Sequence, residues 1–171
     1  DLKLSRGLGD VYKRQLSQSG LIAKSQREFS DKFGAKGCFF GVNGASGLIQ
    51  SAVIAMANPG ENILMPRNVH ISVIKICAMQ NINPIFFDLE FSNGTGHYKP
   101  ITKIWLENVF KKLNLNENKI AGVILVNPSY HGYAGDLEPL IDCCHQKNLP
   151  VLVDEAHGSY FLFCENLNLP K

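Results

Sequence analysis

Residues 121–154 read AGVILVNPSYHGYAGDLEPLIDCCHQKNLPVLVD. The segments 121–126 and 151–154 are short and almost wholly apolar, which is typical of strands buried on both faces of a sheet. Between them, residues 137–146 have the spacing of an amphipathic helix. A strand, a helix and a second strand in this order predict two parallel strands joined by a right-handed crossover.

The same alternation continues toward the N-terminus. We expect further helices over 21–33, 48–57, 70–80 and 102–113, and further strands over 38–42, 62–65 and 84–89. The buried face of the first helix would be formed by Leu21, Ile22, Phe29 and Phe33. Short apolar strands that alternate with helices predict an α/β fold, a three-layer sandwich with a mostly parallel sheet covered on both faces.

Composition excludes several classes of protein. The chain has 171 residues, 45% of them hydrophobic, which fits one domain of ordinary size with a real core. No apolar run approaches the roughly 18 residues of a membrane span, and a net charge of +2 without a dense basic cluster gives little support to nucleic acid as a partner. The five cysteines include no C-x-x-C pair, so we expect buried free thiols, no metal site and a cytoplasmic location.

Residues 1–15, DLKLSRGLGDVYKRQ, differ from the rest of the chain. Their apolar residues follow no clear period, and they hold two of the four arginines. We interpret residues 1–15 as a non-native or flexible leader, which leaves residues 16–171 as the folded region.

Ligands of open α/β sheets gather at the carboxyl ends of the strands, so the residues that follow each expected strand are candidates. Gly44-Ala45-Ser46-Gly47 could cradle a phosphate with backbone N–H groups and the Ser46 hydroxyl, or could be a plain turn capped by Ser46. His70 could lie against an aromatic ligand or act in acid–base chemistry, or could only cap a helix. The polar turn 127–133 could touch a ligand or be only a turn.

The sharpest candidate is Asp154-Glu155-Ala156-His157, which follows an apolar strand. Asp154 and Glu155 would point to opposite sides, so they are not expected to form a catalytic pair. One interpretation is the magnesium box of a helicase-like nucleotidase; the other is that Asp154 holds a proton on a cofactor ring nitrogen. The first requires an upstream G-x-x-x-x-G-K-[ST] loop, which the sequence lacks.

Taken together, these segments resemble the large domain of the Orn/Lys/Arg decarboxylases, which are pyridoxal-phosphate enzymes with the fold type I, aminotransferase-like fold. The matching stretches include 42–47 (VNGASG), 66–72 (PRNVHIS), 127–132 (NPSYHG) and 153–158 (VDEAHG). They occur in the family's order, and together with flanking matches they cover nearly everything from about Leu16 to Lys171.

The resemblance implies a role for each candidate. Gly44, Ala45 and Ser46 would bind the phosphate of pyridoxal 5′-phosphate, with Ser46 supplying the only hydroxyl. His70 would stack on the pyridine ring, and Asp154 would pair with the ring nitrogen. Ala156 would pack against the other face of the ring, with His157 alongside.

The family's cofactor-binding lysine follows a Ser-x-His box, and Lys171, preceded by Leu169-Pro170, does not match it. We therefore expect an incomplete large domain, a fragment that contains no catalytic residue and is inactive alone. The complete enzyme would decarboxylate arginine, lysine or ornithine, a reaction of amino-acid metabolism and polyamine biosynthesis. It would bind no nucleic acid or membrane and would form a homodimer or a higher homo-oligomer. The alternatives are another fold type I enzyme, such as an aminotransferase or a desulfurase, and a catalytically dead binding module.

Overall fold

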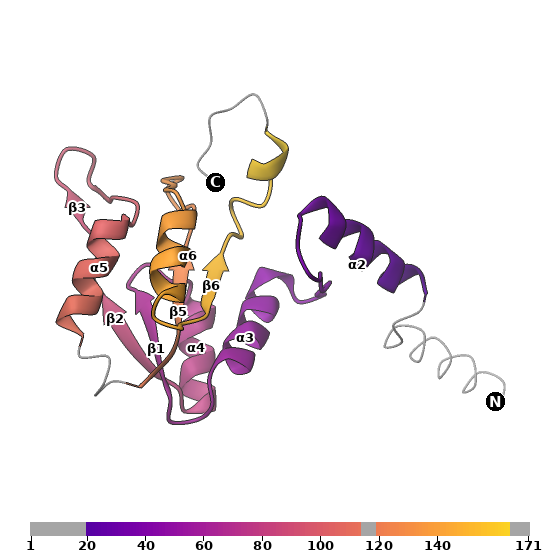
Figure 1. Cartoon of the computed structure of the whole chain (residues 1–171), viewed down its shortest axis with the longest axis horizontal. Helices are drawn as coiled ribbons and strands as arrows, with labels where there is room; N and C mark the ends of the chain where they lie inside the picture. Colours follow the sequence, from indigo (N-terminus) through magenta and orange to yellow (C-terminus); the bar gives the residue numbers. More distant parts are fainter. Residues whose placement is uncertain (1–19, 114–118, 165–171) are drawn as a thin grey trace. The chain divides into compact units, whose positions relative to one another are not determined.

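The computed structural model describes residues 20–113 and 119–164 (Figure 1). The chain divides into two compact units, Asp1–Val42 and Asn43–Lys171. The predicted leader, residues 1–15, lies outside the described residues. Within the described ranges, no helix is long and apolar enough to cross a membrane.

The first unit contains helix α2, Leu21–Lys32, as the sequence predicts. Lys24 and Glu28, one turn apart, form an ion pair of 3.7 Å on its surface. The predicted buried face is wrong: Leu21 is 84% exposed, Ile22 and Phe29 are exposed as well, and Phe33 is half-buried. The described part of this unit contains no sheet against which an apolar helix face could pack.

The predicted strand over residues 38–42 is also wrong, because these residues form no strand. Phe39 is 81% and Val42 is 98% exposed. Phe40 instead meets the Phe29 ring edge-on, with the ring centroids 5.4 Å apart. A strand requires a hydrogen-bonded neighbour, and no described strand pairs with this segment.

The second unit is built on a parallel four-stranded sheet with the order β2-β1-β5-β6. Its strands are β1 (Asn62–Pro66), β2 (Asn83–Phe87), β5 (Ile120–Val126) and β6 (Val151–Asp154). Each agrees with a predicted strand within two residues at either end. The pairing of Val126 with Asp154 brings the carboxyl ends of β5 and β6 to the same edge of the sheet.

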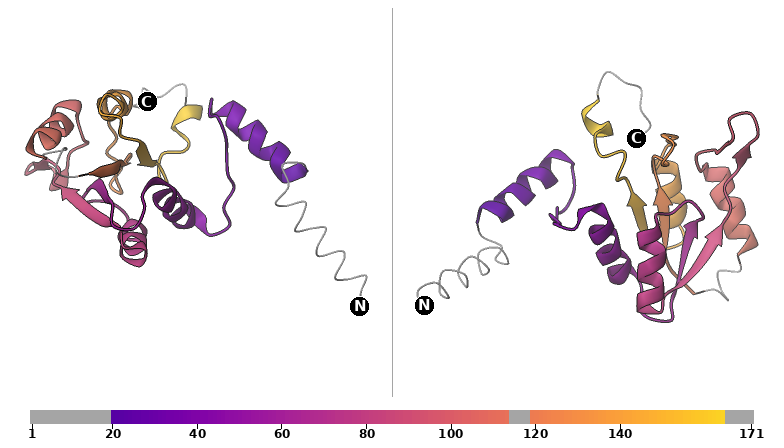
Figure 2. Two further views of the ribbon diagram at one scale, coloured as in Figure 1. Left: turned by 60° about the horizontal axis from the view of Figure 1, so that its bottom comes forward. Right: turned by 180° about the vertical axis from the view of Figure 1, so that it is seen from behind.

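Helices cover both faces of this sheet, so the predicted three-layer arrangement is confirmed for this unit (Figure 2, left). One face is covered by α3 (Gly44–Met56) and α4 (Ile71–Gln80). The other face is covered by α5 (Lys103–Lys112) and α6 (Glu138–His145). The short helix η1, Phe161–Phe163, follows the last strand.

The alternation of side chains along the strands separates the two halves of the core. On β1, Ile63 and Met65 pack toward α3 and α4, whereas Leu64 packs toward α5 and α6. On β5, Ile124 faces the first pair of helices and Leu125 the second. All five side chains are almost completely buried, which fixes the register of the two central strands.

Two segments differ from their predictions in detail. The expected turn over residues 43–47 is mostly helical, since α3 begins at Gly44 rather than at Leu48. The expected loop near residues 92–96 is the turn of an antiparallel hairpin formed by β3 (Phe91–Ser92) and β4 (His97–Tyr98).

All five cysteines are free, and three of them are buried, as predicted: Cys77, Cys143 and Cys144. Burial raises the pKa of each of these thiols, for Cys144 to about 12. Cys38 and Cys164 are only partly buried.

Candidate functional site

A cleft of about 200 Å³ lies at the carboxyl edge of the sheet in the second unit. Four chain segments line it: the start of α3, the β1–α4 connection, the residues after β5 and the residues after β6. The lining residues are Ala45, Ser46, Ile49, Asn68, His70, Val126, Pro128, Tyr130, Asp154, Ala156 and His157. The structure therefore brings together six of the seven predicted site residues, and Gly44 lies directly before the lining residue Ala45.

The start of α3 presents backbone N–H groups at one end of the cleft. Ser46 is the third residue of the helix, so it is not the cap. The cap position is occupied by Asn43, whose side chain makes no capping hydrogen bond. Gly44 has a φ of +65°, a conformation suited to glycine. A Cβ on Gly47 would lie 2.8 Å from the Asn43 Cβ, so this tight entry into the helix requires glycine there. The first turn of a helix leaves N–H groups without partners inside the helix, and these can bind an anion.

His70 shows both of the properties that the sequence left open. Its Nδ1 accepts a hydrogen bond from the Ser72 backbone N–H at 3.2 Å and lies 2.8 Å from Ser72 Oγ, so the ring caps α4. The same ring lines the cleft. An Nδ1 that accepts a hydrogen bond places the proton of the neutral ring on Nε2, and the cap fixes the ring's orientation.

Asp154 is the last residue of β6 and is 8% exposed. Its Oδ1 accepts a hydrogen bond from the Ala156 backbone N–H at 3.2 Å, which holds the carboxylate at the end of the strand. Glu155 is exposed, in agreement with the predicted opposite orientation. Neighbouring atoms still remove enough solvent from Glu155 to raise the pKa of its carboxyl.

Two turns form the wall between β5 and β6. The Asn127 side chain closes the first turn, since it accepts from the Gly135 N–H at 2.9 Å and donates to the Gly135 carbonyl at 3.1 Å. The second turn packs directly against it: a Cβ on Gly158 would lie 2.4 Å from Pro128 Cδ. The position of the residues after Asp154 therefore depends on the turn after β5.

Five lining residues are not among the predicted site residues: Ile49, Asn68, Val126, Pro128 and Tyr130. Two of the five, Asn68 and Tyr130, carry polar side chains. Tyr130 meets the His157 ring edge-on at 5.7 Å, so the polar turn does reach the cleft. Asn68 Oδ1 is buried and has no hydrogen-bond partner among the described residues. Buried polar atoms normally have hydrogen-bond partners, so this acceptor is unusual in the described part of the chain. The surroundings of Asn68 in the folded structure distinguish it from an ordinary loop residue, and the sequence does not show them.

A larger hollow of about 520 Å³ lies between β2 and α5 and shares no lining residue with the cleft. It contains none of the candidate residues. A small hollow of about 100 Å³ adjoins Asn68 on its other side, next to the Arg67–Asp88 ion pair.

A protein-family comparison matches residues 3–169 to the family described as Orn/Lys/Arg decarboxylase, major domain. The chain belongs to the Orn/Lys/Arg decarboxylase family. Pyridoxal 5′-phosphate is the cofactor of this family.

Curated relatives agree with this family. An arginine decarboxylase from Bacillus subtilis (strain 168) is 39% identical over 151 residues, and one from Halalkalibacterium halodurans is 37% identical over 150 residues. Each alignment covers 88% of this chain and 30% of the relative. The chain thus spans about a third of the length of these decarboxylases.

Solved structures confirm the fold. The SepCysS–SepCysE N-terminal domain complex gives a TM-score of 0.67 at 17% identity, covering 86% of this chain and 40% of that one. A tyrosine aminotransferase from Leishmania infantum gives 0.52 at 21% identity, covering 66% of this chain and 29% of that one. The chain therefore has the fold type I, aminotransferase-like architecture.

The cleft residues fit the family's cofactor. Its phosphate is an anion suited to the start of α3, its flat ring suits the wall formed by His70, and its ring nitrogen suits the buried carboxylate of Asp154. Asn68 Oδ1 is an unpaired acceptor in the same wall. The cleft has room for a single substituted ring rather than for a dinucleotide.

Proposed function

We propose that this chain is the cofactor-binding part of a pyridoxal-phosphate-dependent decarboxylase of basic amino acids, with arginine as the preferred substrate. The observation that carries the proposal is the single cleft in which Ala45, Ser46, His70, Asp154, Ala156 and His157 meet. Arginine is favoured over lysine and ornithine because the relatives are named arginine decarboxylases. A cytoplasmic location and a homodimer or higher homo-oligomer are parts of the same proposal.

The start of α3 binds the phosphate in this proposal. Gly44 and Ala45 allow the backbone N–H groups to approach an anion closely, and the Ser46 hydroxyl donates a further hydrogen bond. Only one of these residues carries a hydroxyl, so the backbone supplies most of the donors.

Three other segments orient the ring. His70 stacks on one face, Ala156 leaves room at the other, and His157 lies alongside. Asp154 holds a proton on the ring nitrogen, and its burial strengthens this charge pair. When bound, the cofactor acts as an electron sink for the bond that breaks as carbon dioxide leaves.

Binding of pyridoxamine 5′-phosphate, measured by calorimetry, tests this assignment. The probe has an amine in place of the aldehyde, so it cannot react with surface lysines. We expect Asp154→Asn to weaken binding about 100-fold, since breaking one side of a buried charge pair costs roughly 3 kcal/mol or more. Asp142→Asn, a matched change on the exposed side of α6, should leave the affinity unchanged. Equal affinities for the wild type and Asp154→Asn would overturn the role of Asp154.

Product analysis separates the alternative functions. Expressed together with whatever coding sequence follows Lys171, the protein should release carbon dioxide from arginine faster than from lysine or ornithine. Transfer of the amino group to an oxo acid without carbon dioxide would support an aminotransferase instead. Cofactor binding without either reaction would support a binding module.

A further inference from the structure

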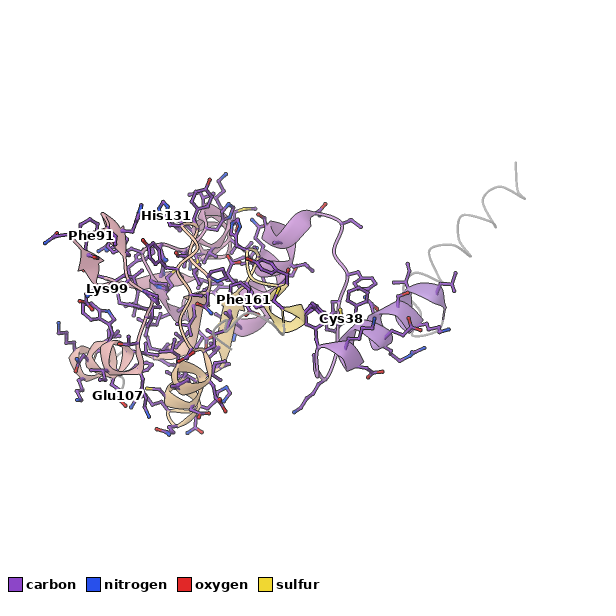
Figure 3. The ribbon with its side chains drawn as sticks, turned by 90° about the horizontal axis from the view of Figure 1, so that it is seen from above. Cys38, Phe91, Lys99, Glu107, His131 and Phe161 are labelled. Atoms are coloured by element: carbon purple, nitrogen blue, oxygen red, sulfur yellow. The ribbon has the colours of Figure 1, made fainter. Side chains whose placement is uncertain are left out.

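A series of aromatic contacts links the β3–β4 hairpin to the cleft. The His97 and His131 rings lie 4.2 Å apart between centroids, at an interplanar angle of 31°. Tyr130 meets His131 at 5.6 Å and His157 at 5.7 Å, and both Tyr130 and His157 line the cleft. Figure 3 shows His131 on the side of the second unit that also carries Phe91 and Lys99, at the two ends of the hairpin segment.

The turn that carries Tyr130 and His131 is tightly bonded within itself. The Gly132 N–H donates to the Ser129 carbonyl at 2.9 Å, and the Tyr133 N–H donates to Ser129 Oγ at 3.2 Å. His97 touches this turn twice, since it also lies 5.8 Å from the Tyr133 ring. The turn should therefore move as one piece, with His97 as an anchor on the hairpin.

Among the described residues, no negatively charged side chain is paired with His97 or His131. The groups that face the pair are the hydroxyl-bearing rings of Tyr130 and Tyr133, and His157 lies beyond Tyr130. On the hairpin side, Tyr98 follows His97, and Lys99 is paired with Glu90. Among the described residues no carboxylate forms an ion pair with either histidine, and no third metal-binding side chain joins them. Two protonated rings at this distance would repel each other without compensation.

We propose that His97 and His131 are positioning residues whose stacked neutral rings hold Tyr130 against His157, and that protonation of both rings opens this contact and loosens the cleft around its ligand. The test therefore compares neutral with mildly acidic solution. Both side chains reach solvent, so salt should screen the repulsion. The effect on the cofactor rests on the proposed function, whereas the ring contact itself does not.

The proposal is tested by comparing the wild type with His97→Phe. This variant keeps a flat ring but has no nitrogen that can be protonated. Affinity for pyridoxamine 5′-phosphate is measured at pH 7.5 and 5.5 in low salt and in 1 M salt. The change in affinity between the two pH values is compared between the two proteins, so that any effect of pH on the probe itself cancels. We expect the acid-induced loss of affinity to be at least threefold larger in the wild type, and this difference to shrink in 1 M salt. His145→Phe, at the end of α6, should behave like the wild type.

Nuclear magnetic resonance gives a readout that needs no ligand. A nuclear Overhauser effect between the His97 and His131 ring protons should be present at pH 7.5 and lost at pH 5.5. Persistence of this effect at pH 5.5, or an equal loss of affinity in His97→Phe and the wild type, would overturn the proposal. If the probe binds at neither pH, the proposed function is wrong. The ring-proton measurement then tests by itself whether the contact between the His97 and His131 rings opens at pH 5.5.

Discussion

At the scale of single residues, His70 has two separable roles in one ring. Its Nδ1 caps α4 through Ser72, and the same ring lines the cleft. Asparagine is among the best cap residues, so His70→Asn should keep the cap and remove the ring. His70→Ala should remove both.

We predict that the free energy of unfolding of His70→Asn, measured in urea, lies within about 0.5 kcal/mol of the wild-type value. The free energy of unfolding of His70→Ala should be about 1 kcal/mol lower than that of the wild type. Both variants should weaken the binding of pyridoxamine 5′-phosphate by the same factor. Wild-type affinity in His70→Asn would show that the ring does not contact the cofactor.

Cys144 gives the fold a measurable pH dependence. Burial raises the pKa of its thiol from 9.0 to about 12, so the folded protein keeps a proton that the unfolded chain releases above about pH 9. Stability should therefore fall as the pH rises through this window, by at most about 1.4 kcal/mol per pH unit from this thiol. Urea unfolding between pH 8 and 10.5 should show a shallower decline for Cys144→Ala than for the wild type. Cys164→Ala is the control, and an unchanged slope in Cys144→Ala would contradict this account.

At the scale of elements, the four strands of the parallel sheet and the helices that cover it could be predicted because apolar periodicity decides them locally, whereas the short β3–β4 hairpin was expected to be a loop. The failures have a physical cause. The strand expected over residues 38–42 and the buried face of α2 both require a packing partner, and an apolar run does not reveal whether one is present. The role of Asn68 could not be predicted either, because an unpaired acceptor is a property of three-dimensional neighbours.

The turns after β5 and β6 form one packed element, and Gly158 lies at their contact. A Cβ there would lie 2.4 Å from Pro128 Cδ and 3.3 Å from the Asn127 carbonyl oxygen, neither of which is the end of a flexible chain. We predict that Gly158→Ala destabilises the protein by about 1–3 kcal/mol and weakens binding of pyridoxamine 5′-phosphate. Gly94→Ala, where a Cβ meets nothing within 4 Å, should leave both unchanged. Normal affinity and stability in Gly158→Ala would show that the two turns are not coupled.

At the scale of the whole molecule, the sheet order β2-β1-β5-β6 explains why residues far apart in sequence share one cleft. Parallel strands end at the same edge, so the residues after β1, β5 and β6 meet there together with the start of α3. The sequence predicted this edge from the positions of the motifs. It did not predict the larger hollow between β2 and α5, which competes with the cleft as a place for a ligand.

The most direct test of the central claim is a backbone amide nuclear magnetic resonance titration with pyridoxamine 5′-phosphate. We predict that the signals of Ala45, Ser46 and Ala156 shift as the probe is added, and that those of Asn108 and Lys112, in the larger hollow, do not. Shifts confined to the β2–α5 hollow, or no shifts at the start of α3, would contradict the assignment of the cleft as the cofactor site.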